Sequence, residues 1–373
     1  MAEEEQMAQV KFADGKKFGI WQIIKSLNEG EFGQVYLVEN SQKEQAVLKA
    51  KSNAIEGGTA IKIETLILKQ LNKNGPRPHI PVIYRAMKRN KYCYFVMELF
   101  GNNLHDLMKA HPNNRFSRGT WSRLGIQCLY GIKYIHDCGF IHRDIKPQHF
   151  VMGNKMNEKR FRMVHILDFG LARPYAIYND KEKRWRPRRG TAEPRGTLRY
   201  MSPNVHRMME QGRVDDVWSL IFVLVEFNGG LPWQSEKDRG KIEEMKLTMN
   251  AKDVMKDMPT CLSEVIPHLD RLNLFDRPDY RMIFKSLWQV LVDEKVNPRT
   301  PYDFETTDAQ IEIAKNETAA DWENSIGTFF MTYPISYDRP EAANIMHPEA
   351  NDEEKSYRSD STQSISKREE TDD

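Results

Sequence analysis

Two acidic motifs in the middle of the chain contain residue types that phosphoryl transfer requires. Residues 141–147 read IHRDIKP and residues 166–170 read ILDFG, which places Asp144 and Asp168 24 positions apart. Asp144 could accept a hydrogen bond from a substrate hydroxyl, and Asp168 could hold magnesium against nucleotide phosphates. Lys146 would neutralise charge on the transferred group. Either motif alone occurs by chance, but both in this order indicate an ATP-dependent phosphotransferase.

Upstream residues match a second requirement, the binding of the nucleotide phosphates. Lys49 lies in a strand-like run, and Glu64 follows 15 residues later in a helix-like run. A lysine held by a carboxylate is a fixed positive charge for the α- and β-phosphates. Gly30 and Gly33 would let backbone N–H groups approach phosphate oxygens. Alone, these residues equally fit a solvated lysine, an exposed glutamate and ordinary hairpin glycines, and only the downstream motifs favour the functional interpretation.

The elements expected around these residues change character along the chain. Runs rich in β-branched and aromatic residues predict strands at 18–24, 33–38, 45–50 and 92–97, with one helix at about 60–71. Apolar residues then recur at intervals of three and four, which predicts helices at 121–138, 214–227, 241–249, 261–274 and 279–293. This order predicts an α+β fold of two lobes, with the active site in the cleft between them. The periodicity weakens after about residue 305.

Composition is that of a soluble globular protein, with 40% hydrophobic and 29% charged residues among 373. The longest apolar run, residues 217–227, is about half a membrane span and predicts a buried helix rather than a membrane contact. The acidic start, MAEEE, lacks the features of a secretory signal. The cysteines have no metal-ligand spacing and are expected to be reduced thiols. We therefore expect an intracellular protein, in the cytoplasm and with the nucleus as a further location.

Charge is distributed unevenly along the chain. Residues 341–373 contain ten acidic and four basic residues, a net charge of −6, which leaves +8 for residues 1–340. A basic body with an acidic tail suggests acidic partners or a tail that folds back. Solvated disorder is the simpler interpretation of the tail's conformation.

Further motifs add a family resemblance to this interpretation. Residues from about 18 to 300 resemble the protein kinase superfamily, and within it the casein kinase I group. The motifs are Ser202-Pro203-Asn204 in place of the usual Ala-Pro-Glu, GTLRY at 196–200, DDVWSL at 215–220, LPWQ at 231–234 and RPDY at 277–280. The tryptophan at 218 and the stretch RWRPRR at 184–189 look closer to the tau-tubulin kinase branch.

The resemblance implies a domain organisation. We expect an N-terminal extension at 1–17, a kinase domain at 18–305, a C-terminal extension of uncertain packing at 306–340, and a disordered acidic, serine-rich tail at 341–373. The resemblance also implies ATP and magnesium as cofactors, with manganese as an alternative metal.

It further implies roles for individual residues. Met97 would be the gatekeeper beside the adenine, and the backbone at Glu98 and Phe100 would contact the base. Val35 and Ala46 would line the nucleotide. Asp216 would brace the catalytic loop. Lys146 and Thr197 together would indicate serine or threonine substrates.

Basic residues imply a substrate class. In the casein kinase I group, residues matching Arg199 and Lys241 form a pocket for acidic or already phosphorylated sites. Arg173 and the basic run at 181–189 would add positive charge. A solvated basic loop is the alternative. Nucleic acid is not expected as a partner, because aromatic residues are not interleaved beyond Trp185. We expect a monomer that acts on proteins, since the segment 197–204 resembles a peptide-docking loop rather than a small-metabolite site.

Two positions depart from the family pattern. Asn28 replaces the first glycine of the loop, which we expect to matter little. His149 replaces an asparagine that supplies an amide oxygen to magnesium. Imidazole nitrogen is a poor ligand for magnesium and a good one for manganese or zinc. His149 and Asp168 are thus the candidate metal ligands, and the change leaves open reduced activity, altered metal preference or an inactive, nucleotide-binding pseudokinase.

The tail suggests an intramolecular partner. Glu353 precedes Ser356 by three residues, and two pairs of serines, 356 with 359 and 361 with 364, have the same spacing. Enzymes resembling casein kinase I favour that spacing. The tail is therefore a candidate autophosphorylated, autoinhibitory segment that docks on the basic body.

Overall fold

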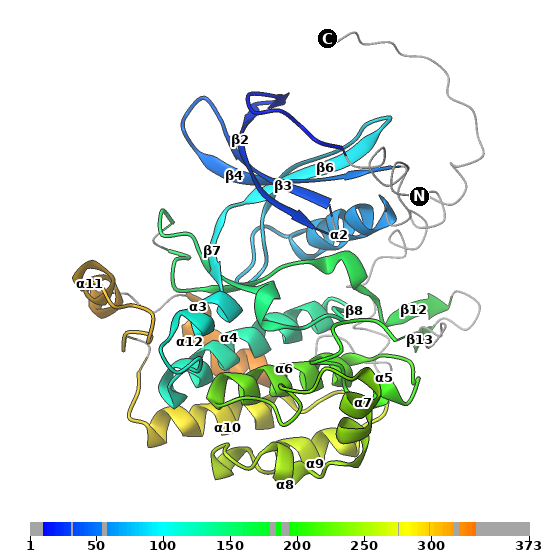
Figure 1. Cartoon of the computed structure of the whole chain (residues 1–373), viewed down its shortest axis with the longest axis vertical. Coiled ribbons are helices and arrows are strands. Elements are labelled where there is room, and N and C mark those ends of the chain that lie inside the picture. The colour runs from blue at the N-terminus through cyan, green and yellow to red at the C-terminus, as the bar shows by residue number, and fades with distance from the viewer. Residues whose placement is uncertain are drawn as a thin grey trace.

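The structure is a computed structural model with two lobes, a strand-rich one above a helical one in Figure 1. It describes residues 10–30, 33–53, 58–157, 159–179, 184–187, 194–274, 276–297, 299–316 and 321–332. The tail at 341–373, most of the basic run at 181–189 and most of the extension at 1–17 lie outside these ranges. None of the helices described is long and apolar enough to cross a bilayer.

The first lobe is a six-stranded antiparallel sheet in the order β1-β2-β3-β4-β6-β5. Its strands are β1 (Lys17–Phe18), β2 (Trp21–Gly30), β3 (Gly33–Glu39), β4 (Gln45–Ser52), β5 (Ile83–Lys88) and β6 (Tyr92–Glu98). The predicted strand at 18–24 is in fact two strands, because Gly19 adopts a φ of 67° and turns the chain between them. Strand β5 was not predicted from the sequence. Its side chains are only partly buried, so the apolar alternation that marks a strand is weak.

Each face of this sheet packs in its own apolar cluster. Aromatic residues of β1 and β2 join Tyr36, Leu48 and Tyr94 on one face. On the other face, Val47, Phe95 and Met97 pack with Ile61 of α2 (Gly58–Leu71). Helix α2 matches the helix predicted at about 60–71, and it brings Glu64 to the face of the sheet that borders the cleft.

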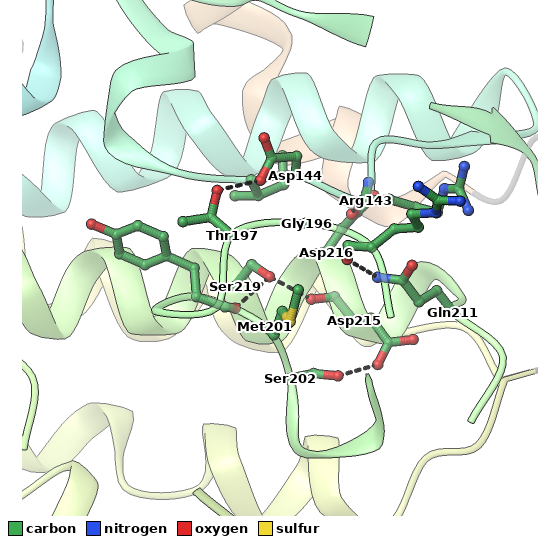
Figure 2. A pocket seen from close by; sticks show the side chains of 13 residues that line it. Arg143, Asp144, Gly196, Thr197, Met201, Ser202, Gln211, Asp215, Asp216 and Ser219 are labelled. Atoms are coloured by element: carbon green, nitrogen blue, oxygen red, sulfur yellow. Dashed lines mark hydrogen bonds between the residues drawn. The ribbon is translucent and has the colours of Figure 1, made fainter. Parts of the chain in front are cut away.

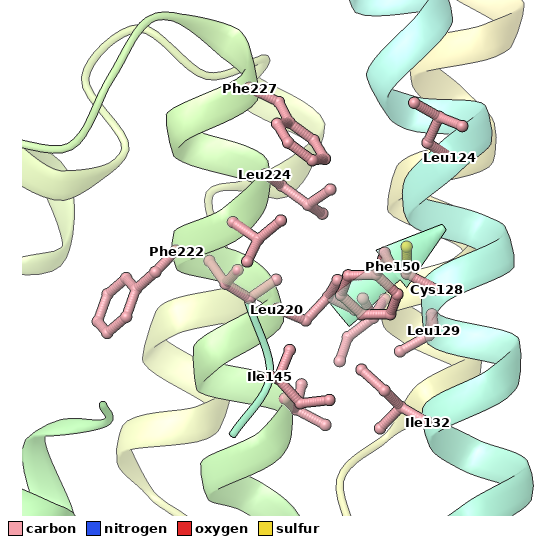
Figure 3. Packing of buried hydrophobic residues seen from close by; sticks show 14 of the residues in the cluster. Leu124, Cys128, Leu129, Ile132, Ile145, Phe150, Leu220, Phe222, Leu224 and Phe227 are labelled. Atoms are coloured by element: carbon pink, nitrogen blue, oxygen red, sulfur yellow. The ribbon is translucent and has the colours of Figure 1, made fainter. Parts of the chain in front are cut away.

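The second lobe is built around two long, buried helices. They are α4 (Arg118–Asp137) and α6 (Arg213–Asn228). Their apolar side chains pack with Ile145 and Phe150, two residues of the segment between these helices, in Figure 3. The predicted helices at 121–138 and 214–227 are confirmed, and the longest apolar run is a buried helix as expected.

Shorter elements complete this lobe. The helices are α3 (Leu104–Ala110), α5 (Pro203–His206), α7 (Arg239–Thr248), α8 (Ala251–Val254), α9 (Val265–Asp270) and α10 (Tyr280–Asp293). The helix predicted at 261–274 is wrong. It is divided into a 3-10 turn, Thr260–Leu262, and the short helix α9, which ends before Leu272.

Three small sheets position the loops of the cleft. Their strands are β7 (Phe100–Asn103), β8 (Phe140–Ile141), β9 (Phe150–Gly153), β10 (Val164–Ile166), β11 (Arg173–Pro174), β12 (Ala176–Asn179) and β13 (Arg184–Pro187). β9 pairs with both β10 and β7, β8 pairs with β11, and β12 pairs with β13. The β7–β9 pairing connects the segment after Glu98 to the strand that directly follows the loop carrying Asp144.

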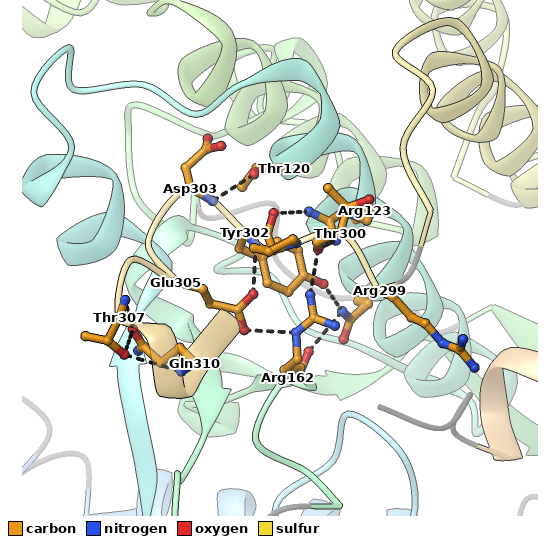
Figure 4. Close-up of polar contacts among 12 residues, drawn as sticks. Thr120, Arg123, Arg162, Arg299, Thr300, Tyr302, Asp303, Glu305, Thr307 and Gln310 are labelled. Carbon is orange, nitrogen blue, oxygen red and sulfur yellow. Dashed lines mark hydrogen bonds and ion pairs between the residues drawn. The ribbon is translucent and has the colours of Figure 1, made fainter. Parts of the chain in front are cut away.

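The segment after α10 is held against the second lobe by buried polar groups. Glu305 forms an ion pair with Arg162 at 2.9 Å and accepts a hydrogen bond from the backbone N–H of Tyr302. Arg123 donates to backbone carbonyls of the same segment, and its guanidinium lies over the Tyr302 ring (Figure 4). This anchoring extends ordered packing beyond the last helix predicted from the sequence.

Two further helices follow where the sequence pattern weakened, α11 (Asp308–Asn316) and α12 (Asp321–Met331). Phe330 is 1% exposed and stacks on Phe284 of α10, while Phe329 stacks on Tyr130 of α4. Lys133 donates a hydrogen bond to the Thr332 hydroxyl at 3.1 Å. The extension whose packing was uncertain from sequence is thus docked on α4 and α10 through α12.

Candidate active site

A buried lysine links the two lobes across the cleft. Lys49 Nζ lies 2.7 Å from Glu64 Oε2 and 3.5 Å from Asp168 Oδ1. Burial alone would lower the pKa of Lys49, but the two carboxylates outweigh it and the pKa is raised. The lysine is therefore a permanent positive charge, and the separation predicted from the sequence brings all three groups together.

Asp168 is held in an unusual backbone conformation. Its φ of 64° is left-handed, and Gly170 N–H donates to its carboxylate at 3.3 Å. The following Phe169 is fully buried, and its ring lies 5.1 Å from that of His142. Burial raises the pKa of Asp168, but neighbouring positive charge, with Lys49 foremost, lowers it to about 2. This carboxylate is ionised at neutral pH and available to a cation.

The loop of residues 142–149, here called the catalytic loop, is braced from below by Asp216. Its two oxygens accept the backbone N–H groups of His142 at 2.6 Å and Arg143 at 2.8 Å. His136 of α4 lies 2.9 Å from the same carboxylate. Arg143 has a φ of 67°, a conformation that persists only when its surroundings fix it. Asp216 thus holds the backbone of this loop through both of its carboxylate oxygens.

A second cluster contains Asp144, Lys146 and Thr197, and each of the three side chains contacts the other two. Thr197 Oγ1 donates to Asp144 Oδ1 at 2.7 Å, and Lys146 Nζ lies 2.9 Å from Asp144 Oδ2 and 3.2 Å from Thr197 Oγ1. Gly196 has a φ of 115°, and a Cβ there would lie 2.5 Å from the Arg143 carbonyl oxygen. Only glycine lets the Thr197 segment approach the loop this closely. Figure 2 shows Asp144 and Thr197 facing each other above Asp215 and Asp216.

His149 lies between Asp144 and Asp168. Its Nδ1 is 2.9 Å from the backbone carbonyl oxygen of Asp144, so Nδ1 must carry the proton and donate it. Nε2 then has its lone pair and lies 3.5 Å from Asp168 Oδ2. Burial lowers the pKa of His149 to about 4, so the ring is neutral at physiological pH.

These donors only partly suit magnesium. Asp168 offers the carboxylate oxygen that magnesium prefers, whereas His149 offers an imidazole nitrogen, which suits manganese or zinc better. Among the residues described, no group of three or more His, Cys, Asp or Glu side chains is arranged to hold a metal. A metal in this site would therefore depend on oxygen atoms of the nucleotide as well as on Asp168.

The residues predicted to face adenine divide between the two sides of the sheet. Val35 pairs with Lys49, and Val47 pairs with Met97, and all four lie on the cleft face. Ala46 does not: it packs in the cluster on the opposite face. Side chains alternate along a strand, so a residue three positions before Lys49 must point away from it. The prediction for Ala46 is corrected to Val47.

The other residues predicted to contact the nucleotide lie at the β2–β3 hairpin and in the connection between the lobes. Gly30 and Gly33 pair at the end of the β2–β3 hairpin. Met97 and Glu98 end β6, and Phe100 begins β7, so they form the connection between the lobes, here called the hinge.

The segment that replaces Ala-Pro-Glu is fastened to α6 by a second aspartate. Asp215 accepts hydrogen bonds from the Ser202 hydroxyl, from Gly212 N–H at 2.7 Å and from Asn204 at 3.3 Å. Burial raises the pKa of Asp215 to about 6. A small pocket lies between this segment and the catalytic loop (Figure 2).

The comparisons with known proteins agree with this geometry. The protein kinase domain profile matches residues 21–296, well over half of the chain. The chain belongs to the protein kinase family. Its lobes, hinge and catalytic loop are those of the bilobal kinase fold.

The names of individual relatives differ in the activity they state. The Caenorhabditis elegans protein named inactive tau-tubulin kinase ttbk-6 is 48% identical over 74% of this chain and 97% of that protein. A probable serine/threonine-protein kinase of Dictyostelium discoideum is 34% identical over 80% of this chain and 59% of that protein. A putative serine/threonine-protein kinase of C. elegans is 33% identical over 81% and 85%. The likeness supports the tau-tubulin kinase-like branch recognised from the motifs.

The predicted anion pocket has carboxylates of its own. Arg199 Nη1 lies 2.6 Å from Glu226 Oε1, and Arg173 forms an ion pair with Glu210. Lys241 is exposed near the start of α7. A substrate anion would compete with Glu226 for Arg199.

Some functional residues were missed at the sequence level. Val47 could have been found from the period of two, counted back from Lys49. His136 and Asp215 act through tertiary contacts, and nothing in their local sequence marks their partners 80 and 13 residues away.

Proposed function

We propose that this protein transfers the γ-phosphate of ATP to serine or threonine side chains of proteins, as a kinase of the casein kinase I type. The observation that carries the proposal is the completeness of two clusters. Lys49 is held by Glu64 and Asp168, and Asp144 is held by Lys146 and Thr197.

Each cluster has a defined task in this proposal. Lys49 binds the α- and β-phosphates, and Asp144 orients the attacking hydroxyl and accepts its hydrogen bond. Lys146 neutralises charge on the transferred group, and Thr197 fixes the orientation of both residues. Asp168 would hold a magnesium or manganese ion, which supplies neutralisation of the β- and γ-phosphates.

A second candidate is a nucleotide-binding scaffold without phosphotransfer. The contact that favours it is the 3.5 Å approach of His149 Nε2 to Asp168 Oδ2, which places imidazole against the metal-binding carboxylate. The name of the 48% identical relative, inactive tau-tubulin kinase, supports the same candidate.

Mass spectrometry separates the two candidates. The full chain is incubated with ATP, an acidic serine peptide, and magnesium or manganese, while thermal shift with ATP is recorded in parallel. The kinase proposal expects a phosphopeptide, whereas a thermal shift without phosphopeptide in either metal would establish the scaffold.

The substrate class and partners extend the proposal. We propose acidic or previously phosphorylated protein sites as substrates, bound by Lys241 and, after displacement of Glu226 and Glu210, by Arg199 and Arg173. The proposed unit is a monomeric domain at 18–305 in an intracellular setting, cytoplasmic and nuclear, without nucleic-acid or membrane partners.

The acidic tail is proposed as an intramolecular competitor for the same basic residues. Comparing the peptide KM and its salt dependence for the full chain and for residues 1–340 tests this. Identical values for the two proteins would rule the tail out as an inhibitor.

A further inference from the structure

A partly buried arginine outside the catalytic motifs, Arg160, lies against the hinge. Arg160 belongs to the connection between β9 and β10, where its N–H donates to the Asn157 carbonyl and its own carbonyl accepts from Met163 N–H, each at 3.0 Å. The backbone passes so close to Gly153 that a Cβ on that glycine would lie 1.8 Å from the Arg160 carbonyl oxygen. The chain path that presents Arg160 therefore depends on glycine at 153.

The Arg160 guanidinium contacts three parts of the molecule at once. Nε donates to His165 Nε2 at 3.0 Å, and Nη2 donates to the Ile80 carbonyl at 2.9 Å. Nη1 lies 3.3 Å from Glu98 Oε2. Ile80 belongs to the segment before β5, Glu98 to the hinge and His165 to β10, so one side chain connects the two lobes beside the hinge.

The contact with Glu98 acts from the side of the hinge opposite the cleft. Met97 packs with Val47 on the cleft face of β6, and the next side chain along a strand points the other way. Glu98 is 7% exposed, and its backbone N–H donates to the Val82 carbonyl at 3.0 Å. Removing the guanidinium would leave its carboxylate buried without a compensating charge.

A second contact passes to the next hinge residue. The Phe100 ring lies 4.7 Å from the His165 ring, and Phe100 pairs with Gly153 across β7 and β9. His165 accepts the Arg160 hydrogen bond, so the orientation of its ring is fixed by the same guanidinium. Both hinge residues whose backbone is proposed to contact adenine are thus supported by Arg160.

We propose that Arg160 is a positioning residue for nucleotide binding, which fixes the hinge backbone by holding Glu98 and, through His165, Phe100. The inference rests on the nucleotide site of the proposed function, but it does not require phosphotransfer. Without the Arg160 guanidinium, the hinge backbone could adopt geometries that hydrogen-bond adenine poorly. Nucleotide affinity would then fall, even though no side chain that contacts the nucleotide had changed.

Arg162 provides a matched control two residues away. Its side chain is 4% exposed against 15% for Arg160, and its ion pair with Glu305 at 2.9 Å anchors the C-terminal segment rather than the hinge (Figure 4). Arg160→Gln and Arg162→Gln each break one arginine–glutamate ion pair, so both should lower the melting temperature. Only the first should alter nucleotide affinity.

The experiment is equilibrium titration of the full chain with ADP in the absence of peptide, with folding checked by circular dichroism. We expect Arg160→Gln to weaken ADP binding about five-fold or more, and Arg162→Gln to leave it unchanged. Glu98→Gln should also weaken ADP binding. The Arg160→Gln, Glu98→Gln double variant should bind ADP no more weakly than Arg160→Gln alone. If Arg160→Gln does not fold, Arg160→Lys and Glu98→Gln carry the test.

Three outcomes overturn the inference, and they are distinguishable. If the folded Arg160 and Glu98 variants bind ADP with the same affinity as the wild type, Arg160 is a stabilising residue only. An equal loss of affinity in Arg162→Gln would do the same. Absence of ADP binding by the wild type would overturn the proposed function, and with it this inference.

Discussion

His149 is the residue whose identity was plain from the sequence and whose role depends on its surroundings. The sequence showed imidazole in place of an amide, but not which ring nitrogen faces the cleft. The Asp144 carbonyl fixes the proton on Nδ1 and leaves the Nε2 lone pair toward Asp168. In that orientation the His149 ring either binds the metal or obstructs metal binding at Asp168, and substitution of His149 distinguishes the two.

We expect His149→Asn to raise phosphotransfer with magnesium more than with manganese, because an amide oxygen suits magnesium better than imidazole does. A gain of about ten-fold in magnesium corresponds to about 1.4 kcal/mol of transition-state stabilisation. Initial rates in each metal give the ratio. A loss of activity in both metals would show that His149 has a productive role that asparagine cannot fill.

At the scale of elements, sequence patterns located the segments that carry the candidate catalytic residues and missed elements defined by tertiary contacts. Lys49, Glu64, Asp144 and Asp168 lie in segments with strong periodicity or sharp motifs. Ala46 was assigned to the wrong face of the sheet. The strand was recognised, but the alternation of its side chains was not counted back from Lys49. Helix α12 was missed because its docking rests on aromatic pairs with α4 and α10, which are distant in sequence.

We expect Phe330→Ala in α12 to lower the free energy of unfolding by about 3 kcal/mol, since a buried aromatic ring is removed from its stack on Phe284. Met331→Ala is the control, because Met331 is 49% exposed and should change stability by less than about 0.5 kcal/mol. Urea denaturation measures both. Equal stability of the two variants would mean that α12 contributes little to the folded domain.

At the scale of the whole molecule, buried neutral histidines should make stability depend on pH. Burial lowers the pKa of His79 to about 3, and of His149 and His206 to about 4, from an ordinary value of 6.5. Between about pH 4 and 6.5 the unfolded chain binds protons at these positions that the folded protein does not. These histidines therefore lower stability as pH drops through this window, while buried carboxyls with raised pKa values, among them Asp215, Glu64 and Glu98, act in the opposite direction.

We expect His79→Gln to reduce that dependence by up to about 1.4 kcal/mol per pH unit, the contribution of one proton. His79 is the appropriate residue because it is fully buried and lies outside the cleft, with Nδ1 2.7 Å from the Val164 carbonyl. Denaturation curves at several pH values between 4.5 and 7 provide the slopes. A slope identical to that of the wild type would mean that His79 does not contribute to the pH dependence.

The central claim, that the two clusters perform phosphotransfer, is tested most directly by one rate measurement. Purified full-length protein is given radiolabelled ATP and an acidic serine peptide, with magnesium and with manganese, beside Asp168→Ala as the inactive control. The account predicts label on the peptide with at least one metal, and none above background for Asp168→Ala. Wild-type incorporation no higher than that of Asp168→Ala in both metals would contradict it.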